Sequence, residues 1–214
     1  SIVYAVDVNA EALDETIQGL AGKAHAVVCD ITNEAAVTEL MATIEKEHGR
    51  LDILVNNAGI GSVDSFLETT LETWQRVINV NLTGAFLCSR EAAKLMTKAG
   101  RGSIINFSST GALTGEGPSH YVASKSGMVG LTRSTARELA PSGIRVNSVV
   151  PGATDTPMMQ GIPKEWMDAM IQGIPLGRLG QTIEVARVAA FLGSDEASFI
   201  TGQNIAVNGG MAFY

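Results

Sequence analysis

The sequence predicts an α/β fold in which a doubly wound parallel sheet carries helices on both faces. Short runs rich in β-branched residues alternate along the chain with longer segments of helical periodicity, which is typical of repeated β-α units. The short runs are mostly apolar throughout, as in strands that are buried on both faces. A chain of 214 residues fits one hydrophobic core, so we expect residues 1–214 to form a single domain.

Each predicted strand is followed by a turn or a helix. The strands are Ile2–Val8, Ala24–Cys29, Ile53–Val55, Ser103–Phe107, Arg145–Val150 and Asn204–Val207. The predicted helices are Ala10–Gly19, Asn33–His48, Leu71–Lys98, Tyr121–Leu139 and Ile183–Leu192. Thr32 and Thr182 are the expected N-caps of the second and last helices, and Gly49 is expected to end the second.

Residues 152–180 break this alternation. Three prolines, Pro157, Pro163 and Pro175, would interrupt a long helix there. The segment is nevertheless apolar, with Met158, Met159, Ile162, Trp166, Met167, Met170 and Ile171. Long connections inside compact domains are often lids, so the segment could close over an apolar substrate. A short helix packed on the domain or on a second subunit is an equal alternative.

Composition excludes several classes of function. The net charge of −7 opposes binding to a phosphate backbone, so we expect no nucleic-acid partner. No apolar run approaches the roughly 18 to 20 residues of a membrane span, and Ser1–Val8 is read as a strand rather than a signal peptide. Cys29 and Cys88 lack metal-ligand spacing and are expected to be reduced core thiols of a cytoplasmic protein without a metal site.

Polar and turn-forming residues follow the predicted strands. They are Asp7, Asp30, Asn56–Gly59, Ser108–Ser109 and Pro151–Gly152. Because ligands of an open parallel sheet bind outside the carboxyl ends of its strands, these residues are the first candidates for a site.

Tyr121 and Lys125 lie one turn apart on a predicted helix, so their side chains share a face. A phenol with a pKa near about 10 exchanges protons poorly at neutral pH, and a nearby ammonium group favours the phenolate. Tyr121 is therefore a candidate general acid or base, with an ordinary surface pair as the alternative. Ser109 could donate its hydroxyl to a carbonyl oxygen, or could simply close a turn at the strand end.

Several motifs occur in one order and at consistent spacing over nearly the whole chain. They are Asn56-Asn57-Ala58-Gly59, Asn79–Gly84, Gly102–Ser109, Tyr121-x-x-x-Lys125, Arg145-Val146-Asn147, Pro151-Gly152-x-x-x-Thr156 and Ile200–Gln203 with Gly209-Gly210. Together they resemble the classical short-chain dehydrogenase/reductase family. The resemblance implies a Rossmann-like fold, a nicotinamide cofactor, a small alcohol or ketone substrate, and a homotetramer assembled through the helices 71–98 and 121–139.

The resemblance also implies catalytic roles. Tyr121 would donate or accept the proton, while Lys125 would lower its pKa and bind the nicotinamide ribose. Asn81 would hold a water molecule in the proton relay. Ser109 would orient the substrate oxygen; Ser108 is its rival, because the usual spacing to the tyrosine points to Ser108 whereas the match of the strand points to Ser109.

The implied cofactor is NAD rather than NADP. Asp7 would accept the adenosine ribose hydroxyls and repel a 2′-phosphate. The other implied contacts follow the length of the cofactor. Asp30 and Ile31 would lie at the adenine, and Asn57, Ala58 and Gly59 along the ribose and phosphates. Pro151, Gly152 and Thr156 would lie at the carboxamide and a phosphate, and Tyr121 and Lys125 at the nicotinamide ribose. For Asp30 and Asn57, capping of a strand end is the alternative role.

One feature of the family is missing from the sequence. Family members begin with a strand and a T-G-x-x-x-G-x-G turn, and no such segment precedes Asp7. Ile2–Val8 and Ile53–Val55 should flank that central strand, so we expect the natural protein to carry about 25 to 35 further N-terminal residues. A smaller departure is Asn208, where the family often has Asp.

The leading hypothesis is an NAD-dependent oxidoreductase that interconverts a secondary alcohol and a ketone by hydride transfer. A nucleotide-binding or interaction protein without catalytic activity is the alternative, and binding of NAD without turnover would favour it. A serine hydrolase using Ser119 and His120 lacks the nucleophile-elbow pattern, and a sugar-nucleotide epimerase would need an additional substrate domain.

Overall fold

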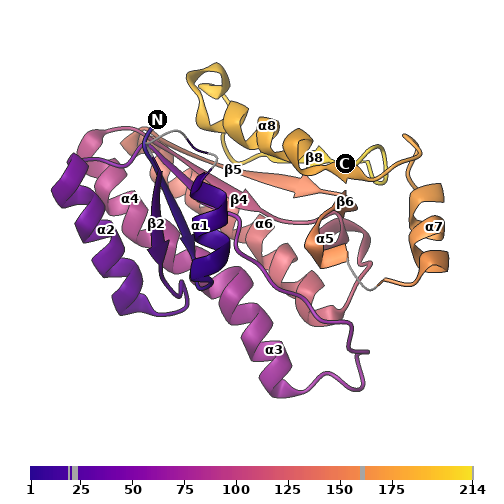
Figure 1. The fold of residues 1–214 in the computed structure, drawn as a ribbon. Helices are drawn as coiled ribbons and strands as arrows, with labels where there is room; N and C mark the ends of the chain where they lie inside the picture. Colours follow the sequence, from indigo (N-terminus) through magenta and orange to yellow (C-terminus); the bar gives the residue numbers. More distant parts are fainter. Residues whose placement is uncertain (19, 21–23, 160–161, 214) are drawn as a thin grey trace.

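The centre of the molecule is a four-stranded parallel sheet in the order β3-β4-β5-β8 (Figure 1). These strands are β3 (Ile53–Asn56), β4 (Gly102–Phe107), β5 (Ile144–Pro151) and β8 (Asn204–Val207). A second parallel pair consists of β1 (Val3–Asp7) and β2 (Ala24–Val28), and a third of the short strands β6 (Thr154–Asp155) and β7 (Gly180–Gln181). The computed structural model describes residues 1–18, 20, 24–159 and 162–213.

The helices follow the strands as the sequence predicts. The α-helices are α1 (Ala10–Gln18), α2 (Glu34–His48), α3 (Leu71–Ile78), α4 (Ala85–Ala99), α5 (Gly111–Thr114), α6 (Ser119–Leu139), α7 (Lys164–Gln172) and α8 (Thr182–Gly193). The predicted helix 10–19 is described as far as Gln18, and Gly19 lies outside the described residues. A π-helical segment, η1 (Asn79–Gly84), joins α3 to α4, and single 3₁₀ turns occupy Ala140–Ser142, Pro157–Met159 and Asp195–Ala197.

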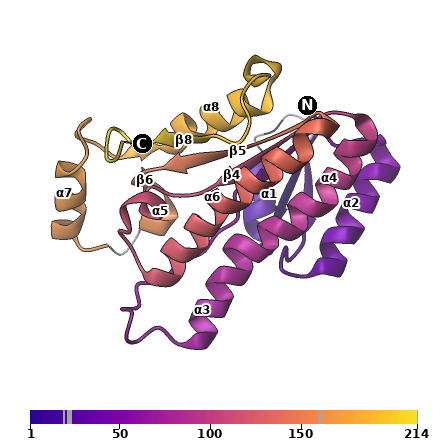
Figure 2. The same cartoon turned by 180° about the vertical axis from the view of Figure 1, so that it is seen from behind.

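Helices cover both faces of the central sheet (Figure 2). Neighbouring residues of a strand point to opposite faces, so Ile104 packs into the core beneath α2 and α4, while Ile105 packs into the core beneath α8. Both isoleucines are fully buried. This arrangement confirms the predicted doubly covered parallel sheet.

The strands do not form one continuous sheet among the described residues. β1 pairs with β2 and β3 pairs with β4, but β1 and β3 are not paired with each other. One edge of each strand therefore lacks a ladder partner in this part of the chain, and Val3, Ile53 and Val55 are 43–46% exposed. The sequence predicts a further central strand at this position.

Two predicted helix caps are wrong for local reasons. Asn33, not Thr32, caps α2, because Asn33 Oδ1 accepts from the amides of Ala35 and Ala36 while the Thr32 hydroxyl donates to Asp30. Gln181, not Thr182, caps α8, where it forms a reciprocal capping box with Glu184.

The predicted helix 71–98 is also not uniformly α-helical. The wider turns of η1 separate α3 from α4. Such insertions are frequent at functional sites, and this one contains Asn81, one of the candidate site residues. Periodicity alone does not reveal a π-helical insertion, because Leu71–Lys98 has the pattern of one continuous amphipathic helix.

The segment 152–180 contains the strand β6 and the helix α7 and ends at the first residue of β7. No residue of α7 is buried, and Trp166 is 70% exposed. The short helix that was one alternative is present, but the described residues do not pack it into the body of the domain. Gln160 and Gly161 lie outside the described residues.

Cys29 and Cys88 are both buried free thiols, as expected. In the part of the chain that the structure describes, no helix combines the length and the apolar character needed to cross a bilayer.

A buried chain of polar side chains ties the central strands to the helices behind them. Asn56 on β3 donates to Ser89 on α4 and to Asn106 on β4, both over 2.8 Å. Asn106 in turn donates to the hydroxyl of Thr132 on α6 over 2.9 Å. Because a buried polar group without a partner is costly, this network fixes the register between sheet and helices.

We expect Asn106→Ala to lower the free energy of unfolding by about 2 to 4 kcal/mol, because it leaves Asn56 and Thr132 short of partners in the core. The control Asn33→Ala removes only the cap of α2 and should cost about 1 kcal/mol. Urea unfolding followed by circular dichroism measures both. Equal effects of the two substitutions would contradict the structural role of the network.

Candidate active site

The candidate site lies where the carboxyl end of β4 meets the first turns of α6. Lys125 makes two hydrogen bonds at the end of β4, one through its side chain and one through its backbone. Its Nζ donates to the carbonyl oxygen of Phe107 over 2.8 Å, and its own carbonyl oxygen accepts from Ser108 Oγ over 2.8 Å. These two bonds hold α6 on the end of β4 and place Tyr121, one turn earlier, beside Ser109.

The two candidate serines have different surroundings. The hydroxyl of Ser108 is buried and is used to bind the backbone of Lys125. The hydroxyl of Ser109 accepts from the amide of Gly111 and forms a hydrogen bond with the phenol of Tyr121. Of the two, Ser109 is therefore the serine whose hydroxyl lies beside the Tyr121 phenol.

Asn81 faces the same site from the π-helical segment η1. Its side chain holds both backbone groups of Ile60, since Oδ1 accepts from the amide and Nδ2 donates to the carbonyl oxygen, over 2.8 and 2.9 Å. Nδ2 also donates to Ser124 Oγ over 3.0 Å. Asn81 is fully buried, and it fixes the loop after β3 against α6.

Burial dominates the electrostatics of the pair on α6. The Lys125 ammonium is almost fully buried, and desolvation lowers its pKa to about 8. Burial also raises the pKa of Tyr121, and the hydrogen bond with Ser109 opposes that rise. The expected lowering of the phenol pKa by Lys125 is not found, because Nζ lies 5.8 Å from the ring centroid and donates to Phe107.

The residues on the proposed adenosine side are accessible carboxylates at strand ends. Asp7 ends β1, and its Oδ1 accepts from the amide of Asn9 over 2.9 Å. Asp30 follows β2 by two positions, and its Oδ1 accepts from the amide and the hydroxyl of Thr32. Ile31 packs on Gly84, where an added Cβ would lie 2.7 Å from Ile31 Cδ1.

The loop after β3 runs close to Lys125 and Asn81. Asn57 and Ala58 are exposed. At Gly59, an added Cβ would lie 3.3 Å from Lys125 Nζ and 3.4 Å from Asn81 Oδ1. The missing side chain therefore leaves room for the Lys125 ammonium group and the Asn81 side chain beside the loop.

The ends of β5 and β8 close the opposite side. The carbonyl oxygen of Pro151 accepts from the amide and the hydroxyl of Thr110. Gly152 donates to Val207 over 3.0 Å, and a Cβ there would lie 2.8 Å from the Cα of Asn208. Thr156, half-buried, lies at the start of the segment that leads to α7.

Sequence reasoning missed three members of this arrangement. They are the carbonyl oxygen of Phe107, which binds Lys125, the hydroxyl of Ser124, which binds Asn81, and Ser62, which lies 2.8 Å from His120 Nε2. A backbone carbonyl carries no sequence signal. Ser124 directly precedes Lys125 within Tyr121-x-x-x-Lys125. Its position next to a candidate site residue could have indicated a contact with the neighbouring segment η1.

Comparisons with known proteins agree on one class of relative. A family model described as enoyl-(acyl carrier protein) reductase matches residues 2–212. The 3-oxoacyl-[acyl-carrier-protein] reductase FabG of Thermotoga maritima is 41% identical over 213 residues, covering 98% of this chain and 87% of that protein. The meso-2,3-butanediol dehydrogenase of Serratia marcescens is 40% identical, covering 98% of this chain and 84% of that protein.

The fold has a solved counterpart. A protein from Burkholderia xenovorans, described as a short-chain dehydrogenase/reductase, superposes with a TM-score of 0.92 at 37% identity. The match covers 98% of this chain and 84% of that protein.

The burial of Lys125 predicts a pH dependence of stability. Its pKa is about 8 in the folded protein, against an ordinary value of 10.5, so between these values the unfolded chain binds more protons. The free energy of unfolding should therefore gain a contribution from this residue as the pH rises from about 8 to about 10.5. Lys125→Met should remove that gain, as measured by denaturant unfolding across this pH range, and an unchanged slope would contradict the burial of the ammonium group.

Proposed function

Because the chain belongs to the classical short-chain dehydrogenase/reductase family, we propose that it is an NAD-dependent oxidoreductase that interconverts a secondary alcohol and a ketone. The observation that carries this proposal is the convergence of Ser109, Tyr121 and Lys125 at the carboxyl end of β4. The relatives named as a reductase and a dehydrogenase support redox chemistry at such a site.

The proton is handled by Tyr121. In the direction of alcohol oxidation, Tyr121 in its phenolate form accepts the hydroxyl proton of the substrate and becomes the neutral phenol, while Ser109 donates a hydrogen bond to the substrate oxygen. The nicotinamide ring supplies the redox chemistry by accepting a hydride at C4 when bound. In ketone reduction, Tyr121 returns its proton to the carbonyl oxygen.

Lys125 and Asn81 support that transfer in different ways. With a pKa of about 8, Lys125 is mostly protonated at neutral pH and can bind a ribose hydroxyl through the space left by Gly59. Asn81 keeps the backbone of Ile60 in place, and we assign to it the binding of a water molecule that connects the site to solvent. These roles remain proposals that rest on the contacts described above.

The residues of this chain fit a nicotinamide dinucleotide at the nicotinamide ribose and at the adenosine. Lys125 and Gly59 would hold the first ribose, Asp7 the second, and Asp30 with Ile31 the adenine. Gly152 and Thr156 would hold the carboxamide and a phosphate. The exposed carboxylate of Asp7 favours NAD, because a 2′-phosphate would meet like charge there.

We propose residues 152–180 as the segment that covers the substrate. Met158 and Trp166 are 59% and 70% exposed there, so an apolar substrate would give these side chains a partner. The relatives carry names that include an acyl carrier protein, a diol and, for the Sinomonas cyclohexanicum protein, a cyclohexanecarboxylate. We therefore propose only that the substrate is partly apolar.

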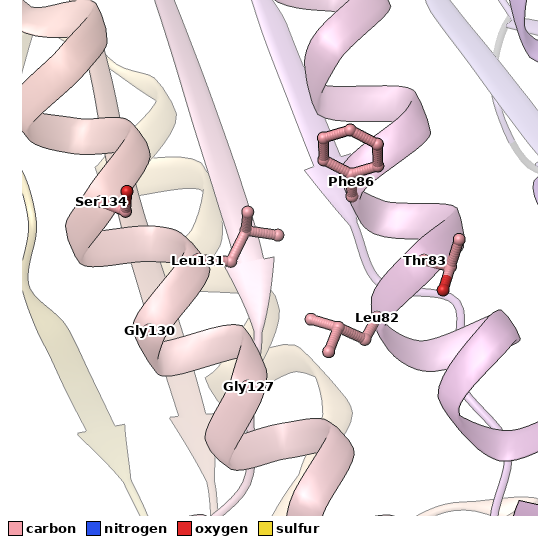
Figure 3. A pocket seen from close by; sticks show the side chains of 7 residues that line it. All are labelled: Leu82, Thr83, Phe86, Gly127, Gly130, Leu131 and Ser134. Atoms are coloured by element: carbon pink, nitrogen blue, oxygen red, sulfur yellow. The ribbon is translucent and has the colours of Figure 1, made fainter. Parts of the chain in front are cut away.

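We also propose assembly through the outer faces of α4 and α6. A hollow of about 410 Å³ lies between them, lined by Leu82, Thr83, Phe86, Gly127, Gly130, Leu131 and Ser134 (Figure 3). Phe86 is 43% exposed, and an added Cβ at Gly130 would meet no atom within 4 Å. This largely apolar face is suited to pack on a second copy in a homotetramer.

We expect Tyr121→Phe to retain the fold and NADH affinity but to lower kcat by about 10² to 10⁴, the range of general acid–base catalysis. The matched control is Tyr4→Phe, which removes the phenol that binds Glu47 and His48 outside the site. Steady-state kinetics with a secondary alcohol provide the measurement. A Tyr121→Phe variant that turns over as fast as the Tyr4→Phe control would exclude Tyr121 from the mechanism.

Asp7→Ala should relax the preference for NAD over NADP, because it removes a carboxylate from beside the 2′-phosphate. We expect kcat/KM with NADPH to rise by about tenfold relative to NADH, equivalent to about 1.4 kcal/mol. Asp14→Ala, on the exposed side of α1, should leave the ratio unchanged. An unchanged ratio in both variants would place cofactor discrimination elsewhere.

A further inference from the structure

The first turn of α6 carries Tyr121 but has no side-chain cap. The N-cap residue is Pro118, which offers no hydrogen-bonding side chain, and no capping bond is formed there. The first backbone bond of the helix runs from the amide of Val122 to the carbonyl oxygen of Pro118 over 2.9 Å. An uncapped first turn frays easily, since its amides have few partners.

A hydrogen-bonded chain from another segment holds this turn instead. His120 is fully buried, directly before Tyr121, and its Nε2 lies 2.8 Å from Ser62 Oγ. Ser62 Oγ in turn donates to Asp64 Oδ2 over 2.9 Å. A hydroxyl has one proton, and that of Ser62 goes to the carboxylate, so Nε2 of His120 carries the proton that Ser62 accepts.

The chain Asp64–Ser62–His120 therefore fixes one tautomer of His120. Nδ1 is buried and has no hydrogen-bond partner among the described residues. An unprotonated ring nitrogen is less costly there than a protonated one, because a buried N–H donor without an acceptor loses its hydration without replacement. His120 thus serves as a donor to Ser62 through Nε2.

The segment that carries Ser62 also borders the phenol ring. Asn81 holds the segment at Ile60, as described above. An added Cβ at Gly61 would lie 3.7 Å from Tyr121 Cδ2, so the loop passes beside the ring. Beyond Ser62, the apolar side chains Val63 and Phe66 are 95% and 75% exposed and contribute little packing.

We propose that His120 is a positioning residue, which replaces the missing helix cap by binding Ser62 and so fixes both the first turn of α6 and the loop beside Tyr121. This inference rests on the proposed function, because positioning Tyr121 matters for turnover only if Tyr121 moves the proton. A displacement of about 1 Å in such a group can lower the rate by about 10².

The test combines Ser62→Ala, His120→Leu and the double variant. Each single variant should lower kcat by about ten- to a hundredfold with little change in the Kd for NADH. The kcat of the double variant should be no lower than that of either single variant, because both substitutions break the same hydrogen bond. His120→Gln, whose side-chain amide can donate to Ser62, should recover part of the loss. Ser65→Ala is the matched control, because the Ser65 hydroxyl donates to Glu68 of the same loop.

A second readout does not depend on turnover. Hydrogen exchange at the Val122 amide reports opening of the first turn, and we expect it to be about five- to tenfold faster in Ser62→Ala, corresponding to the loss of one hydrogen bond. Wild-type kcat and wild-type exchange in both single variants would overturn the inference. If Tyr121→Phe also turned over normally, the proposed function would fail instead. The exchange rate at Val122 would then alone decide whether the hydrogen bonds of Asp64, Ser62 and His120 hold the first turn of α6.

Discussion

The contact between Lys125 and the end of β4 is the constraint on which the rest of the site depends. Lys125 donates through Nζ to Phe107 and accepts through its backbone carbonyl from Ser108, so one residue is bound to the last position of β4 and to the residue that follows it. These bonds bring an ammonium group out of water, which lowers its pKa to about 8. They also set the distance between α6 and β4, and hence the approach of Tyr121 to Ser109.

The same buried region joins the other parts of the site. Asn81 connects the π-helical segment to the loop after β3 and to Ser124 of α6, while Asn56 and Asn106 connect β3 and β4 to α4 and α6. Polar side chains thus provide directional contacts between elements that apolar packing alone would let slide. The site is built where these contacts converge, at the carboxyl ends of the parallel strands.

Much of the fold could be predicted from the sequence, because apolar runs of strand length and amphipathic helices have distinct periods. β8 has the predicted bounds. β1 and β5 differ from the predicted bounds by one residue at both ends, and β2, β3 and β4 differ by one residue at one end. Asn33 and Gln181 were missed as caps because Thr32 and Thr182 are equally good candidates by residue type, and only the backbone decides between neighbours.

The candidate site was predicted less completely. Tyr121, Lys125, Ser109 and Asn81 were found through motifs, and the structure brings them together. The pKa of Tyr121 was misjudged, because burial cannot be read from the spacing to Lys125.

A direct titration of the lysine side chains by NMR tests the central claim, the docking of Lys125 on β4. One resonance, absent in Lys125→Met, should titrate near pH 8. Titration of every lysine near about 10.4, the value for a solvated side chain, would contradict the docking of Lys125 on β4.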